Sequence, residues 1–252
     1  MKLVDSASIP TVLTLVGAGG KSSLMSALAS EMLASGRTVI MTTTTKMYAP
    51  DSVHVPQTLL TNQKNFLVSL REQLLKHSIT CIGSTLNRSS GKLIGVNPEQ
   101  VKELKQFADF TFVEADGAAG MGVKGTEDWE PVIPSCSDCV FYVIGLDCIG
   151  KPANSLVVHK LDKFLKQSGL QQDEPISLRS LARLVNHDMA GLKRVPKKAS
   201  LYVVLNKSDR LHSIKVAMEL GSMMLSYPSS PIQGVIVTGL FSGERRSFSV
   251  AV

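Results

Sequence analysis

The chain of 252 residues lacks the long apolar run that a membrane span requires, because no stretch reaches about 18 apolar residues. Its N-terminal segment, from Met1 to Pro10, also lacks a basic start followed by an apolar core, the pattern of a secretory signal. Both absences argue against a membrane-spanning or exported protein. We therefore expect a cytoplasmic protein with no membrane partner.

Cysteine is scarce, with four residues, at positions 81, 136, 139 and 148. A cytoplasmic protein keeps such thiols reduced. Cys136 and Cys139 form a C-x-x-C pair, but no second pair and no nearby pair of histidines accompanies it. A zinc site is therefore poorly supported, and we favour unreactive cysteines over a metal or redox role.

Positive charge is in modest excess, with a net charge of +6, and it is scattered along the chain. The densest cluster places Lys193-Arg194 and Lys197-Lys198 around Pro196. Because no aromatic residue interleaves with these side chains, we favour a solvated connector over a nucleic-acid patch and expect no nucleic-acid partner. The mild positive balance also suits an enzyme with a polyphosphate substrate.

Apolar runs alternate with segments of helical periodicity along the chain. The expected strands are residues 12–16, 39–43, 80–82, 110–114, 140–144, 201–205 and 234–237, and the expected helices are residues 24–33, 65–76, 98–106, 177–185 and 213–225. This alternation predicts a three-layer α/β fold with a mostly parallel sheet and a P-loop NTPase-like topology. We expect one nucleotide-binding domain over residues 1–252, interrupted by an irregular insert at 83–97 and a candidate lid loop at 116–137.

The most informative stretch lies between the first expected strand and the first expected helix. It reads Gly17, Ala18, Gly19, Gly20, Lys21, Ser22 and Ser23. Glycines let a backbone approach an anion closely, and the N–H groups at a helix start point toward it. Lys21 is expected to bind the terminal phosphates as a catalytic group, and Ser22 is expected to bind Mg²⁺. The stretch predicts a nucleoside triphosphate, either ATP or GTP, as the ligand.

This glycine loop is shorter than the usual pattern G-x-x-x-x-G-K-[ST], because Leu15 stands where the first glycine belongs. The alternative is a glycine-rich turn that packs closely and binds nothing. Lys21 and Ser22, directly after the last glycine, favour phosphate binding.

Polar residues follow two further expected strands. The run from Thr42 through Thr45 to Lys46 ends the second strand, where Thr44 and Lys46 are candidates to contact the γ-phosphate, with Lys46 in a catalytic role. The alternative is an ordinary strand end rich in β-branched residues.

The strand at residues 110–114 runs into Glu114-Ala115-Asp116-Gly117. An acid at the end of an apolar strand is the expected second Mg²⁺ anchor of a phosphate-loop enzyme. Glu114 and Asp116 are both candidate metal ligands, because side chains two positions apart on a strand point to the same face. One of the two acids is expected to activate a nucleophile, and Asp116 is our candidate for this role. The alternative is a plain turn that ends the strand.

A late apolar strand is followed by Asn206-Lys207-Ser208-Asp209. GTP-binding proteins use an N-K-x-D motif at this place to bind guanine. By this comparison, Asp209 is expected to accept hydrogen bonds from the guanine ring, and Asn206 and Lys207 are expected to support the base pocket. Proteins that bind adenine also carry polar strand ends, so both bases stay open.

Taken together, these motifs resemble the YqeC family. The resemblance runs from the first strand to beyond Asp209, and its motifs are residues 16–23, 42–46, 114–117, 130–134, 145–147, 159–160 and 206–209. Members are described as selenium-dependent hydroxylase accessory proteins. The resemblance implies a nucleotide-binding protein that matures selenium-dependent molybdenum hydroxylases, with a hydroxylase or its selenium cofactor as partner. It does not imply a reaction.

Three functional hypotheses follow. The first is an Mg²⁺-dependent NTPase or phosphoryl- or nucleotidyl-transfer enzyme, and the second is a nucleotide-gated binding module with little turnover. The third is an ATP-dependent ligase similar to the Mur type, whose loop reads G-T-N-G-K-[ST]. Within the candidate lid, residues 124–134 combine charges with Trp129, which indicates either a cover over the phosphates or a solvated loop with a buried Trp129. His159 is either an acid–base group or a structural histidine at a strand end.

Overall fold

A nine-stranded sheet forms the centre of the computed structural model, which describes residues 11–49, 58–187, 190–239 and 248–250. The strand order is β14-β13-β12-β10-β1-β8-β2-β5-β4. Neighbouring strands pair in parallel, except that β14 runs antiparallel to β13. The strands are β1 (Thr11–Gly17), β2 (Val39–Thr43), β4 (Thr58–Leu60), β5 (Ile79–Gly83), β8 (Phe110–Glu114), β10 (Cys139–Gly145), β12 (Ser200–Asn206), β13 (Gly234–Val237) and β14 (Phe248–Val250).

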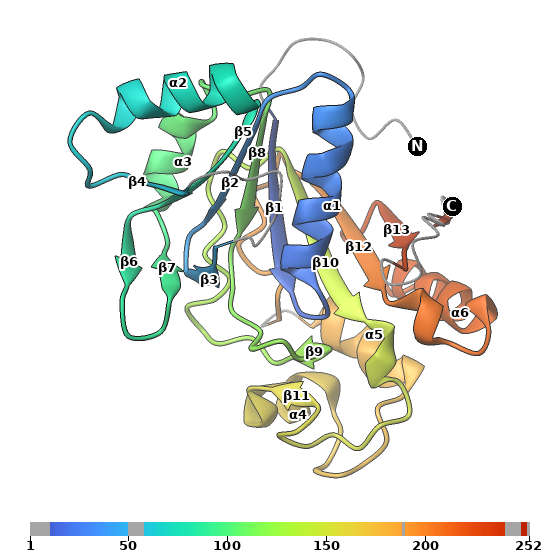
Figure 1. Cartoon of the computed structure of the whole chain (residues 1–252). Helices are drawn as coiled ribbons and strands as arrows, with labels where there is room; N and C mark the ends of the chain where they lie inside the picture. The colour runs from blue at the N-terminus through green and yellow to red at the C-terminus, as the bar shows by residue number, and fades with distance from the viewer. Residues whose placement is uncertain (1–10, 50–57, 188–189, 240–247, 251–252) are drawn as a thin grey trace.

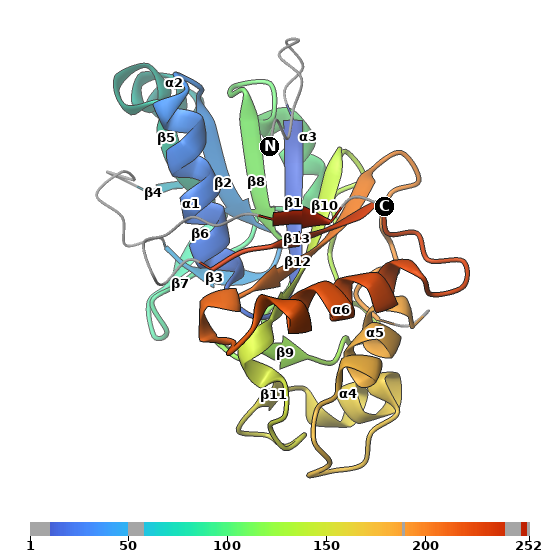
Figure 2. The same cartoon turned by 90° about the vertical axis from the view of Figure 1, so that its right-hand side faces the viewer.

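Helices cover both faces of this sheet (Figures 1 and 2). Helix α1 (Lys21–Ala34) packs through Leu24 and Met25 on the face that carries Leu13 and Leu15. The opposite face carries alternate residues such as Val12. Four helices cover that face: α2 (Phe66–His77), α3 (Pro98–Leu104), α5 (Leu178–Asn186) and α6 (Ile214–Leu225). These three layers confirm the predicted α/β class with its mostly parallel sheet.

Local sequence signals explain where several helices begin. Asn97 caps α3 by accepting from the Glu99 N–H at 3.0 Å, and Pro98 occupies the first turn, where its missing N–H costs nothing. Ser177 caps α5 in the same way by accepting from the Ser180 N–H. The strand–helix alternation that the sequence predicts is therefore supported by capping chemistry as well as by apolar periodicity.

Two small sheets lie beyond the carboxyl edge of the large one. The insert at residues 83–97 forms the hairpin β6 (Thr85–Asn87) and β7 (Lys92–Ile94), and β7 pairs with β3 (Lys46–Tyr48). The candidate lid contributes β9 (Val123–Lys124), which pairs in parallel with β11 (Val158–His159) just before α4 (Leu161–Ser168). Two short 3₁₀ turns, η1 (Leu146–Cys148) and η2 (Ser208–Arg210), follow β10 and β12. Strands this short leave no recognisable period in the sequence.

The topology brings the predicted motifs to one edge. Strand β8 lies between β1 and β2, with Glu114 paired to Leu15 on one side and to Thr43 on the other. Strand β10 lies on the other side of β1 and carries Gly145 opposite Asn206 of β12. Ligands of open α/β sheets bind at this carboxyl edge. In the described parts of the chain, no helix is both long and apolar enough to cross a membrane.

Substitution of Gly19 tests how closely the glycine loop packs on the sheet. Gly19 has a φ of +92°, and a Cβ there would lie 2.0 Å from the Gly145 nitrogen. We expect Gly19→Ala to lower the free energy of unfolding in urea by about 2–5 kcal/mol, from left-handed strain plus overpacking. Gly36→Ala is the control, because its φ is +72° with nothing within 4 Å, and it should cost about 1 kcal/mol. Equal losses in the two variants would contradict the close packing.

Candidate functional site

The glycine loop joins β1 to α1 and packs directly on the ends of β10 and β12. A Cβ at Gly17 would meet the Val143 carbonyl oxygen at 2.4 Å, so Gly17 and Gly19 are both required for contact with β10. The Asn206 side-chain amide donates to the Gly19 carbonyl at 2.8 Å. The loop is therefore a closely packed turn, as the alternative interpretation holds, and the case for a ligand depends on the residues that follow the glycines.

Helix α1 begins immediately after the loop. No side chain in the described part of the chain caps its N-terminus, and its first turn contains no acidic residue. The first N–H groups of a helix have no partner within the helix and carry partial positive charge. Ser22 and Ser23 are exposed on this turn. The turn can therefore accept an anion from solvent.

The end of β8 reaches this helix start through Glu114. The Ser22 hydroxyl donates to Glu114 Oε2 at 2.7 Å. Burial raises the pKa of Glu114 above its ordinary value, and the nearby Lys21 charge offsets this only in part. A serine hydroxyl beside a carboxylate is an oxygen donor pair of the kind that Mg²⁺ prefers, so Ser22 and Glu114 fit the predicted metal.

Asp116 occupies a different position from Glu114, although it is only two residues away. Its side chain is fully buried, and its Oδ2 accepts from the Gly17 N–H at 2.9 Å. Lys21 Nζ lies 3.0 Å from Oδ1, and Lys124 Nζ lies 3.2 Å from Oδ2. The structure therefore directs Glu114 toward Ser22 and Asp116 toward two lysines.

Both members of the Lys21–Asp116 pair are held in their charged forms. Burial by itself raises the pKa of Asp116, but the charges of Lys21 and Lys124 outweigh it and the pKa is lowered. Burial by itself lowers the pKa of Lys21, but the charges of Asp116 and Glu114 outweigh it and the pKa is raised. Lys21 Nζ also donates to the Gly17 carbonyl at 2.6 Å.

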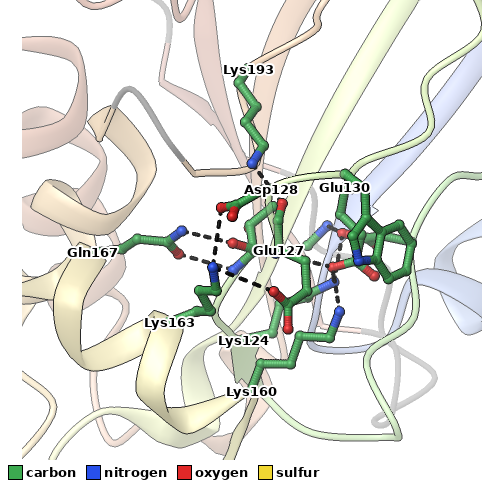
Figure 3. Close-up of polar contacts among 12 residues, drawn as sticks. Lys124, Glu127, Asp128, Glu130, Lys160, Lys163, Gln167 and Lys193 are labelled. Carbon is green, nitrogen blue, oxygen red and sulfur yellow. Dashed lines mark hydrogen bonds and ion pairs between the residues drawn. The ribbon is translucent and has the colours of Figure 1, made fainter.

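The ion pairs continue away from the loop. Lys124 Nζ donates to Glu130 Oε2 at 2.8 Å, and Lys160 Nζ lies 2.8 Å from the same oxygen (Figure 3). The Lys160 ammonium also lies 4.8 Å from the centre of the Trp129 ring, a cation–π distance. We call this series, from Lys21 through Asp116, Lys124 and Glu130 to Lys160, the charge chain.

The candidate lid is fastened to the body of the protein around the charge chain. The Thr126 backbone exchanges two hydrogen bonds of 2.9 Å with the Gln167 amide of α4. Lys193 donates to the Glu127 carbonyl at 2.6 Å, and Arg194 donates to the carbonyls of Asp128 and Trp129. A lid that moved as a whole would have to break these contacts.

The structure differs from the sequence interpretation of this region at two points. Trp129 is 57% exposed, which contradicts the solvated-loop alternative with its buried tryptophan, while Lys124 and Glu130 near it are buried. Lys193 and Arg194 are not merely a solvated connector, because both hold carbonyl groups of the lid. The second difference has a tertiary cause: the lid's carbonyl groups need partners once β9 and β11 bring it against α4, and Lys193 and Arg194 supply them.

The threonine-rich strand end is used largely for structure. The Thr43 hydroxyl donates to the Glu114 carbonyl, and the Thr44 hydroxyl donates to the Val132 carbonyl, each at 2.7 Å. Lys46 is exposed on β3, where its backbone pairs with Ile94. The structure thus places Thr44 between β2 and the lid, and it places Lys46 outside the charge chain.

The late motif after β12 lies beside the glycine loop. Asn206 contacts Gly19, while Lys207 Nζ pairs with Asp147 Oδ2 at 2.9 Å. Asp209 is exposed in η2. The structure brings Asn206 and Lys207 to the edge that carries the loop, and it leaves the Asp209 carboxylate open to solvent.

The four cysteines take no part in the charge chain, whereas His159 lies beside it. Burial raises the pKa of Cys139 to about 12, which leaves its thiol protonated at neutral pH. Among the described residues, no group of three or more His, Cys, Asp or Glu has a metal-binding arrangement. His159 ends β11, and burial together with the charges of Lys124 and Lys160 lowers its pKa.

Sequence reasoning singled out the segments 124–134 and 159–160 but missed that their charged side chains form one series with Asp116. Lys124 and Glu130 stand near Trp129 in the sequence, whereas Lys160 lies 31 positions after it, and nothing in their spacing marks the three as partners. Their contact depends on the pairing of Lys124 with His159 across β9 and β11, which a single sequence does not reveal.

These features define an α/β protein with a glycine loop, an uncapped helix start and paired acids at one sheet edge. A family model described as YqeC protein matches residues 13–162. A protein of Escherichia coli (strain K12) described as uncharacterized protein YqeC is 34% identical over 213 residues, which cover 84% of this chain and 81% of that protein. The chain belongs to the YqeC family.

A solved structure of FlhF complexed with GMPPNP and Mg²⁺ is also similar, with a TM-score of 0.42 and 14% sequence identity, over 98% of this chain and 72% of that one. A likeness of this degree carries no weight for the ligand.

Removal of the Asp116 charge tests the importance of its two lysine partners. Asp116→Asn leaves Lys21 and Lys124 buried without their shared carboxylate, so we expect a loss of about 3–5 kcal/mol in the free energy of unfolding. The control is Asp109→Asn, because Asp109 also accepts from a backbone N–H, that of Thr38 at 2.8 Å, but is half-exposed. It should cost about 1 kcal/mol in the same urea titration. A loss at Asp116 no larger than at Asp109 would contradict the central role of the buried pair.

Proposed function

We propose that the chain binds a nucleoside triphosphate with Mg²⁺ at the glycine loop and acts on it as an NTPase or phosphoryl-transfer protein. The observation that carries this proposal is the uncapped start of α1, where Lys21 and the Ser22–Glu114 pair meet at the carboxyl edge of the sheet. An N-terminal helix turn, a lysine and an oxygen donor pair are the three elements that phosphates and their metal require.

The roles divide among the residues of the loop. The N–H groups of Gly17, Ala18 and Gly19 already donate to Asp116, Val143 and Met121. The groups that remain to donate to the phosphates are therefore the N–H groups of Gly20 and of the first turn of α1, from Lys21 to Ser23, together with the Lys21 ammonium.

The two acids differ in role. Ser22 and Glu114 would hold the Mg²⁺, which would neutralise charge on the phosphates. Asp116, ionised and paired with Lys124, is the group that remains to orient or activate a nucleophile. Thr44 and Lys46 stay predicted contacts of the γ-phosphate.

The biological role that we propose is the maturation of selenium-dependent molybdenum hydroxylases, with the hydroxylase or its selenium cofactor as partner. Its support is the family resemblance alone. A nucleotide-gated binding module is the second candidate function, and the charge chain favours it because it links the loop to an exposed surface. The Mur-like ligase alternative is supported only by the glycine loop.

Calorimetric titration with Mg–ATP and Mg–GTP tests the proposal. We expect one nucleotide to bind the wild type, and Lys21→Ala to weaken that binding by about 10- to 100-fold, because a charged hydrogen-bond donor to phosphate is lost. Lys76→Ala, an exposed change on α2, is the matched control and should bind as the wild type does. If the wild type binds neither nucleotide, the proposal fails.

Base preference is tested at Asp209. If the carboxylate binds guanine, Asp209→Asn should weaken Mg–GTP binding by about 10-fold or more and leave Mg–ATP binding unchanged. Asp162→Asn, an exposed substitution on α4, serves as the control. Equal affinities of the wild type for the two nucleotides would exclude guanine recognition.

A further inference from the structure

The charge chain extends from Lys21, at the end of the glycine loop, to the protein surface. Its charges alternate in sign from Lys21 to Lys160, and its three middle members, Asp116, Lys124 and Glu130, are buried. It ends against Trp129, the one tryptophan of the chain, which is 57% exposed. The charge chain joins the glycine loop to the candidate lid, and Figure 3 shows its outer part, from Lys124 through Glu130 to Lys160.

The Lys21 ammonium already has two partners within the protein. Lys21 Nζ is engaged by the Gly17 carbonyl at 2.6 Å and by Asp116 at 3.0 Å. To bind a phosphate, the ammonium must give up part of this engagement. Asp116 is then a buried carboxylate that has lost one of two cations, a state that is costly unless the second cation compensates.

Lys124 is the group able to compensate. Its ammonium lies between two carboxylates, 3.2 Å from Asp116 and 2.8 Å from Glu130. A shift toward Asp116 weakens its contact with Glu130. Glu130 then depends more on Lys160, whose ammonium also contacts the Trp129 ring.

We propose that the charge chain is a relay that reports nucleotide binding at the glycine loop to the surface around Trp129. The proposal rests on the proposed nucleotide binding and adds its regulation. Binding of Mg–nucleotide draws Lys21 from Asp116, Lys124 moves toward Asp116, and the Glu130–Lys160–Trp129 contacts rearrange. The backbone of the lid stays fastened at Thr126 and Glu127, so the signal is carried by side chains.

Trp129 fluorescence reads this relay directly, because no other tryptophan contributes. Nucleotide binding is measured independently by calorimetry. We expect Mg–ATP or Mg–GTP, whichever binds, to change the fluorescence of the wild type with the same midpoint as the calorimetric titration. In Lys124→Met the nucleotide should bind more weakly, because Asp116 has no second cation, and the fluorescence change at saturating nucleotide should be lost. Lys163→Met is the matched control, since Lys163 contacts Asp128 beside Trp129 but lies outside the charge chain, and it should keep the change.

The outcomes separate the relay from nucleotide binding itself. If the wild type binds nucleotide in calorimetry without a change in Trp129 fluorescence, the relay is overturned and the proposed function stays intact. The same holds if Lys124→Met shows the full fluorescence change of the wild type. Absence of calorimetric binding to the wild type overturns the proposed function and the relay with it. If Lys124→Met does not fold, Glu130→Gln is used instead, because it removes the charge of the next member of the charge chain and keeps the side-chain shape. In this variant too, the fluorescence change should be lost while nucleotide still binds.

Discussion

The ion pairs of Asp116 hold the candidate site together. One buried carboxylate accepts from the backbone of the glycine loop, faces the lysine that starts α1, and faces the lysine of β9. A buried charge is tolerated only when its partners are well placed, so each of these three segments is constrained by the same group. The position of the loop, the direction of Lys21 and the placement of the lid are therefore not independent features of the fold.

The main elements were predictable because apolar runs mark buried parallel strands. The strands β2, β8 and β13 have the expected bounds. Local pattern fails where an element is two or three residues long, as in β3, β9 and β11, since no period can be recognised over that length. These short elements, together with α4, position the lid.

The candidate site also contains residues that the sequence indicated and residues that only the tertiary packing brings together. Sequence spacing indicated the loop, Glu114 and Asp116, because each follows an apolar strand. It left the roles of the two acids open, and the contacts of Ser22 and Lys124 separate them. Sequence spacing could not show that Lys124 and Glu130 are buried together, since that depends on the packing of β9 against β11. It also treated glycines as evidence for a ligand, whereas Gly17 and Gly19 are needed for close contact with β10.

The hydrogen bond from Asn206 to Gly19 has a further consequence for how the site comes into being. It joins residues separated by 187 positions in the sequence. Strand β12 leaves the ribosome well after the glycine loop, because it follows the loop by this distance in the sequence. Contacts of such high sequence separation form late in folding because long-range closure costs chain entropy. A nascent chain without β12 therefore carries a glycine loop that lacks this contact, and the loop is completed only when β12 has docked.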